Sequence, residues 1–153
     1  MPKSFAAALA LTVSAVASAQ VPAVPDLSNA TPLPGAWSYA ALPGASESTF
    51  RDASARPQLW IRCTRASRQV SIARPAGAAA PFLLVWTSSA TRSLPASFDP
   101  ATGRITAQLA MMDPLLDALA FSRGRIGVSV SGQPALAVPS YEEIARVVED
   151  CRI

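Results

Sequence analysis

Short segments in which apolar and polar residues alternate are the feature of this sequence that most constrains its fold. Residues 58–63, 69–73, 104–109 and 126–130 all follow this pattern. Because successive side chains of a β-strand point to opposite faces of the sheet, such alternation predicts strands that bury one face. The sequence shows no internal repeat and no regular succession of strand, helix and strand. These observations predict an antiparallel sheet rather than a parallel one.

Other segments complete the predicted sheet. Further strands are expected over residues 37–42, 91–94 and 136–138, and a weak strand or turn over 48–52. The polar turn between residues 58–63 and 69–73 predicts a hairpin. Residues 82–87 are apolar up to their last position, which predicts a central strand covered on both faces.

Two helices are predicted late in the chain. Asp113 and Pro114 are typical of an N-cap and a first helical residue, and Gly124 would end this short helix. Its apolar stripe comprises Leu115, Leu116 and Leu119. A capping box over residues 140–143 predicts the start of a C-terminal helix. The inner face of that helix would comprise Tyr141, Ile144, Ala145 and Val148. The predicted fold is therefore mainly β, an antiparallel β-sandwich or curled sheet with one short helix and a C-terminal helix packed on it.

The first residues have the features of a secretory signal peptide. Lys3 precedes an apolar run over residues 5–16, and Ala17-Ser18-Ala19 is the small-residue pattern that signal peptidase accepts. The run is shorter than the roughly 17–25 residues that span a bilayer, so a membrane anchor is the less favoured alternative. We expect cleavage after Ala19, a periplasmic or secreted protein, and no transmembrane segment in the mature chain. The expected organisation is a signal peptide (1–19), a flexible proline-rich lead-in (20–35) and a single β-rich domain (36–153).

The two cysteines, Cys63 and Cys151, predict one disulfide bond. Exported proteins with an even number of cysteines usually pair them. Cys63 shares a strand face with Leu59 and Ile61, and Cys151 shares a helix face with Val148. A bond between them would fix the last helix to an early strand. A redox-active pair is the alternative, but the sequence has no C-x-x-C motif and no nearby lysine or histidine to lower a thiol pKa.

The composition restricts the chemistry that the protein can perform. The chain contains no histidine, which removes Ser-His-Asp and Cys-His catalysis and imidazole metal ligands. Two cysteines are too few for an all-thiolate zinc site, so we expect no metal and no cofactor. The net charge of +3 is small and scattered, so nucleic acid is not an expected partner. The arginine-rich and alanine-rich composition is typical of a GC-rich bacterium.

Carboxylates offer one route to an enzyme. Asp113 and Asp117 lie four residues apart on one helix, and Asp52 or Asp99 could meet Asp113 in a pocket. A small carboxylate-dependent hydrolase is therefore an alternative function. A helix cap and a solvated acid in the first turn explain Asp113 and Asp117 more simply.

Two groups of residues are candidates for a binding surface. Trp60 is predicted on the strand face opposite Leu59 and Ile61, beside Arg62, where an exposed Trp-Arg strip would suit a protein or a glycan. Arg123 and Arg125 flank Gly124 at a turn, where their guanidinium groups could bind a carboxylate or phosphate. Solvated charge at loops and helix ends is the simpler interpretation of these arginines.

Together these elements resemble small exported proteobacterial proteins of the invasion-associated locus B type and related type VI secretion accessory proteins. The shared pattern is a signal peptide, the early Trp37, an L-x-I-R-C strand over Leu59–Cys63, a late strand pair and a terminal helix that ends in Cys151. The resemblance implies a β-sandwich without known catalysis that acts at the envelope through protein contacts. It carries no functional residues over to this chain.

Three functions follow from these observations. The first is an exported, non-enzymatic envelope protein that binds a protein or a component such as peptidoglycan. The second is a structural envelope protein without a specific ligand, and the third is the carboxylate-dependent hydrolase. A flat strip around Trp60 and Arg62 would favour the first, and a pocket with two acids would favour the third.

Overall fold

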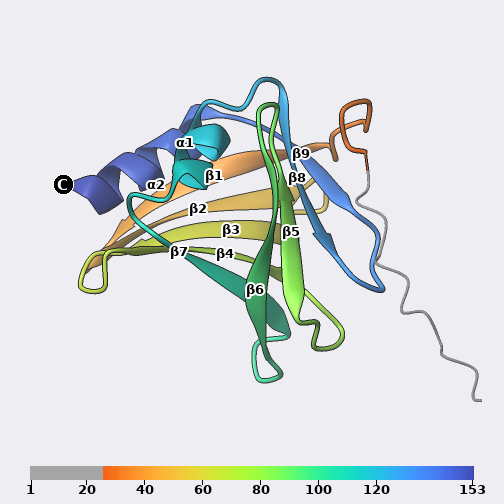
Figure 1. Cartoon of the computed structure of the whole chain (residues 1–153), viewed down its shortest axis with the longest axis horizontal. Helices are drawn as coiled ribbons and strands as arrows, with labels where there is room; N and C mark the ends of the chain where they lie inside the picture. Colours follow the sequence, from red (N-terminus) through yellow and green to blue (C-terminus); the bar gives the residue numbers. More distant parts are fainter. Residues whose placement is uncertain (1–25) are drawn as a thin grey trace, which may run out of the picture.

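The computed structural model describes residues 26–153, which form one curled antiparallel sheet and two helices (Figure 1). Hydrogen-bonded neighbours in this sheet follow the order β1-β2-β3-β4-β7-β6-β5-β8-β9. The strands are β1 (Gly35–Leu42), β2 (Ala45–Asp52), β3 (Pro57–Thr64), β4 (Gln69–Pro75), β5 (Phe82–Trp86), β6 (Thr91–Asp99), β7 (Arg104–Ala110), β8 (Arg125–Val130) and β9 (Leu136–Pro139). The predicted mainly β fold is confirmed, and the strands adopt the curled arrangement.

The two edges of the sheet meet through a few hydrogen bonds. The backbone N–H of Leu33 donates to the carbonyl of Ala137 at 2.8 Å. The indole Nε1 of Trp37, on β1, donates to the carbonyl of Pro139, on β9, at 2.8 Å. The sheet is therefore nearly closed, and its inner face encloses the apolar core.

Two strands are longer than their alternation predicts. β2 begins at Ala45 rather than Ser48, and its full length pairs with β1 in a hairpin that turns at Gly44. β6 continues to Asp99, because its first half pairs with β5 and its second half with β7. The residues of both extensions show no clear alternation, and their cross-strand pairing determines their conformation.

The prediction that β5 is covered on both faces is wrong. Leu83 and Val85 are completely buried on the inner face, but Phe82 is 53% exposed and Leu84 and Trp86 are only half-buried. The outer face of this continuously apolar strand is thus partly open to solvent, because no element formed by residues 26–153 covers it there.

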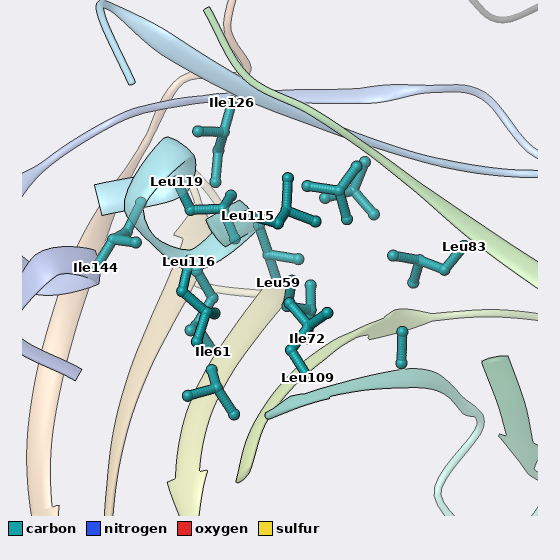
Figure 2. Packing of buried hydrophobic residues seen from close by; sticks show 14 of the residues in the cluster. Leu59, Ile61, Ile72, Leu83, Leu109, Leu115, Leu116, Leu119, Ile126 and Ile144 are labelled. Carbon is teal, nitrogen blue, oxygen red and sulfur yellow. The ribbon is translucent and has the colours of Figure 1, made fainter. Parts of the chain in front are cut away.

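The core lies between the inner face of the sheet and α1 (Pro114–Ala120). As predicted, Asp113 caps this helix, and its carboxylate accepts a hydrogen bond from the N–H of Leu115. Figure 2 shows the predicted stripe of Leu115, Leu116 and Leu119 pointing toward the strands, where it packs into the main buried cluster. The helix ends at Ala120, before the predicted Gly124, which instead adopts a positive φ in the turn that precedes β8.

α2 (Glu142–Arg152) lies across the inner face of β1 to β4 and contacts α1 (Figure 1). The predicted capping box is wrong: the N-cap is Tyr141, and no side chain within residues 26–153 caps this end. Tyr141 is also exposed rather than buried, and Val147 joins Ile144, Val148 and Cys151 on the buried face. In a capping box the Glu143 side chain would accept a hydrogen bond from the N–H of Ser140, but this N–H donates to the carbonyl of Gly124 instead.

Leu27, which precedes β1, packs on the sheet. Leu27 is 5% exposed and lies on Gly127 of β8, where any side chain on residue 127 would collide with it. The proline content of the lead-in did not reveal this contact, which depends on a glycine one hundred residues later. The predicted signal peptide, residues 1–19, lies outside the described residues.

Candidate binding surface

The predicted disulfide joins Cys63 of β3 to Cys151 of α2, with the two Cα atoms 5.4 Å apart. Both cysteines are almost completely buried, as their shared faces with apolar residues predict. Further contacts hold α2 along the same face of the sheet. The Ser48 hydroxyl donates to the carbonyl of Glu143 at 2.6 Å, and the Tyr39 hydroxyl donates to a carboxylate oxygen of Asp150 at 2.6 Å. The disulfide and the Tyr39 hydrogen bond therefore hold the C-terminal end of α2, and the Ser48 hydrogen bond holds its N-terminal end.

Trp60 lies on the outer face of β3, opposite Leu59 and Ile61, as predicted. The predicted exposure of its ring is wrong, since Trp60 is only 7% exposed. The guanidinium carbon of Arg104, on β7, lies 3.7 Å from the centroid of the ring and covers it. The strands bring these residues together because Trp60 is in register with Ala73 of β4, and Ala73 with Thr106 of β7. Small residues between them let the indole lie across the sheet.

Arg62 supplies the exposed charge beside this ring. Its side chain is 44% exposed, and its Nη1 lies 3.4 Å from an oxygen of Glu47 on β2. A solvated ion pair of this kind contributes at most about 1 kcal/mol, so Arg62 can exchange Glu47 for another anion at little cost. We name Trp60, Arg62 and Arg104 the Trp60 face. It combines a flat aromatic ring with two guanidinium groups.

The second predicted pair of arginines lies elsewhere. Arg123 is exposed in the turn that precedes β8, and an Nη1–H of Arg125 donates to the backbone carbonyl of Ala30. β8 and β3 are separated by at least three strands in either direction around the sheet. The structure therefore does not bring Arg123 and Arg125 together with Trp60 and Arg62. Arg125 instead helps to hold the lead-in against the sheet.

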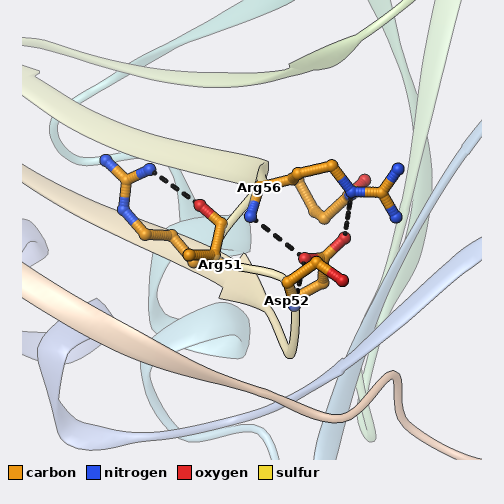
Figure 3. Close-up of polar contacts among 6 residues, drawn as sticks. Arg51, Asp52 and Arg56 are labelled. Carbon is orange, nitrogen blue, oxygen red and sulfur yellow. Dashed lines mark hydrogen bonds and ion pairs between the residues drawn. The ribbon is translucent and has the colours of Figure 1, made fainter.

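Asp52, one of the candidate catalytic acids, accepts several hydrogen bonds that stabilise a turn. Figure 3 shows this carboxylate at the turn between β2 and β3, where it accepts hydrogen bonds from the backbone N–H and the Nε of Arg56. It also accepts hydrogen bonds from the N–H of Ser54 and the amide of Gln58. Burial raises the pKa of Asp52, but these hydrogen bonds outweigh burial and lower the pKa overall.

The remaining candidate acids are also partnered. A 2.7 Å bond from Arg92 lowers the pKa of Asp113, and hydrogen bonds from Thr102 lower that of Asp99. Asp117 forms an ion pair with Arg152 at 2.7 Å. A general acid of a hydrolase needs a raised pKa. The lowered pKa values of Asp52, Asp99 and Asp113 suit stabilising contacts better than that role.

Sequence reasoning missed Arg104 and Glu47, the two residues that contact the predicted pair of Trp60 and Arg62. Both lie on strands other than β3, so only the sheet order and register reveal these contacts. The alternation of 104–109 places Arg104 on an outer face, but nothing in the sequence pairs that face with Trp60.

Among residues 26–153, no three acidic or cysteine side chains are close enough together to hold a metal ion. Nor does this part of the chain contain a helix with the length and apolar character to cross a bilayer. Comparisons with protein-family models, with curated proteins and with solved structures found no match to this chain.

Proposed function

We propose that this protein is an exported bacterial envelope protein that binds a protein or a cell-envelope component, and that the Trp60 face makes the contact. The observation that carries the proposal is the tryptophan ring on the outer face of the sheet, covered by one arginine and flanked by another. The disulfide between Cys63 and Cys151 supports an oxidising compartment, because such bonds persist mainly outside the cytoplasm.

The chemistry of the Trp60 face suits an acidic or glycan partner. Tryptophan and arginine are the residue types that most often dominate binding energy at interfaces. A partner that binds the guanidinium groups of Arg62 and Arg104 would draw Arg104 away from the indole and expose the ring for stacking. The resemblance to the locus B type proteins is consistent with this proposal, since it too implies action through protein contacts.

Crosslinking followed by pull-down from the periplasm tests this proposal. The bait is the mature protein, and purified peptidoglycan sacculi provide a second, cell-free arm. The test variant carries Arg62→Glu and Arg104→Glu, which reverses both charges and leaves Trp60 in place. The control is Arg123→Glu, a charge reversal at an exposed arginine in the distant turn that precedes β8. Thermal unfolding establishes that both variants are folded.

We expect the double variant to lose the partner that the wild type and the Arg123→Glu control retain. A contribution of about 2–4 kcal/mol from the face corresponds to a loss of roughly 30-fold to 1000-fold in affinity. Identical capture by all three proteins would contradict the proposed face. Absence of any specific partner in either arm would favour the structural role instead.

A further inference from the structure

Arg74 crosses the interior of the curled sheet. It follows Val70 and Ile72 on the inner face of β4 and is in register with the completely buried Ile105 of β7. Its Nη1 donates to the carbonyl of Val128, on β8, at 3.0 Å and to the carbonyl of Pro134 at 3.2 Å. Because β4 and β8 are not neighbours in the sheet, the side chain connects opposite walls of the fold.

The hydrogen bonds of this guanidinium group are incomplete. A guanidinium has five N–H donors, and the two bonds to Val128 and Pro134 use only Nη1. Nε is buried and has no hydrogen-bond partner among residues 26–153, and the hydrogen bonds that this side chain makes there come from Nη1 alone. Nε and Nη2 form one edge of the planar group, the edge that binds carboxylates with two parallel hydrogen bonds.

No acid within residues 26–153 balances the charge of Arg74. The ion pairs there involve Arg56, Arg62, Arg92 and Arg152. Arg74 is nonetheless only 8% exposed, and burial lowers its pKa. Burying a guanidinium without a counter-ion is unfavourable, and an apolar side chain of similar size would avoid this penalty. A buried cation whose bidentate edge has no partner is the arrangement expected of an anion site.

Two loops form the rim of the sheet above this residue. One follows β4, and the other joins β8 to β9 and includes Pro134. The side-chain amide of Gln133 links them in the amide orientation that satisfies both neighbours, in which its nitrogen donates to the carbonyl of Pro75 at 3.3 Å and its oxygen accepts from the N–H of Gly77 at 3.1 Å. These two bonds join the loop that follows β4 to the loop that joins β8 to β9.

We propose that Arg74 binds a carboxylate group at its Nε and Nη2 edge, inside the end of the sheet that these two loops close. The carboxylate enters when the loops separate and the Gln133 bonds break. Two coplanar oxygens and one negative charge match the free edge and the single positive charge of Arg74. The group belongs to a small molecule or to the C-terminus of a peptide. This site is independent of the Trp60 face.

Nuclear magnetic resonance of the oxidised protein labelled with ¹⁵N-arginine tests the proposal. The Nε–H signal of Arg74 is assigned as the one lost in an Arg74→Met or Arg74→Lys variant. The protein is then titrated with acetate, with acetamide as the neutral analogue, and with inorganic phosphate. A trialanine peptide and its C-terminal amide distinguish a peptide terminus from a free small carboxylate.

We expect acetate to shift the Arg74 Nε–H signal saturably, and acetamide and phosphate to bind at least about tenfold more weakly. Tighter binding of trialanine than of acetate assigns the site to peptide ends, and the reverse assigns it to small carboxylates. Arg74→Lys retains the charge without the planar group and should lose about tenfold or more in acetate affinity. Gln133→Ala should bind acetate more tightly, because it removes the bonds that join the two loops.

Arg92→Met is the matched control, because Arg92 also lies on the inner face but already has Asp113 as its partner. It should bind acetate as the wild type does. An Arg74 signal unmoved by any carboxylate would overturn the proposal, as would equal shifts with acetamide or phosphate. Equal acetate binding by folded Arg74→Lys would do the same. If Arg74→Met does not fold, the titration of the wild type still decides the question.

Discussion

Reduction of the disulfide should destabilise the fold by an amount that follows from the position of the cysteines. Cys63 and Cys151 are 88 residues apart in the sequence. Closing a loop of that length lowers the entropy of the unfolded chain, which corresponds to about 4.6 kcal/mol of stability at 25 °C. The native contacts of α2 with Ser48 and Tyr39 remain after reduction, so the effect should arise mainly in the unfolded state.

Urea unfolding of the oxidised and reduced proteins measures this difference. For a slope of about 1.5 kcal/mol/M, a loss of 4.6 kcal/mol lowers the midpoint by about 3 M. The slope itself should rise on reduction, because the unfolded chain without the bond exposes more surface. A double variant, Cys63→Ala with Cys151→Ala, is the control and should not respond to the reductant. A loss below about 1 kcal/mol with an unchanged slope would refute the reasoning.

Three other substitutions test individual contacts. Gly127→Ala should displace Leu27 and cost about 1–3 kcal/mol in urea unfolding, and this cost should vanish in a Leu27→Ala background. Asp113→Ala should cost about 1 kcal/mol at pH 7 through the lost helix cap. Because the folded protein lowers the pKa of Asp113, its ionised carboxylate stabilises the fold above about pH 4. The free energies of unfolding of wild type and variant should therefore converge as the pH falls below that value. Arg104→Ala should uncover Trp60, increase its fluorescence quenching by acrylamide and cost about 0.5–1 kcal/mol. Unchanged quenching would show that Arg104 does not shield the ring.

Local patterns predicted much of the fold because they report on single elements. Alternation located most strands, and Asp113 followed by Pro114 identified the start of α1. The pairing of Cys63 with Cys151 followed from the faces that each cysteine shares with apolar neighbours. The strands and the helix start depend on residues within a few positions of one another, and the chain has only two cysteines to pair, so one sequence suffices to predict these features.

Features that depend on distant residues were missed. Trp60 is covered by Arg104 because three strands lie in a particular register, and Leu27 is buried because residue 127 lacks a side chain. The N-cap of α2 is Tyr141 rather than Ser140. The N–H of Ser140 donates to the carbonyl of Gly124, a contact that the local sequence does not reveal. The alternation of β4 does place Arg74 inward, but only the three-dimensional structure shows that no acid within residues 26–153 forms an ion pair with it.

We propose above all that this protein acts outside the cytoplasm, with Cys63 and Cys151 joined in a disulfide. The intact mass of the protein recovered from its native cells, alkylated without prior reduction, tests that claim most directly. We expect residues 20–153 with two hydrogens fewer than the dithiol and no added alkyl group. A mass that retains residues 1–19, or that carries two alkyl groups on Cys63 and Cys151, would contradict it.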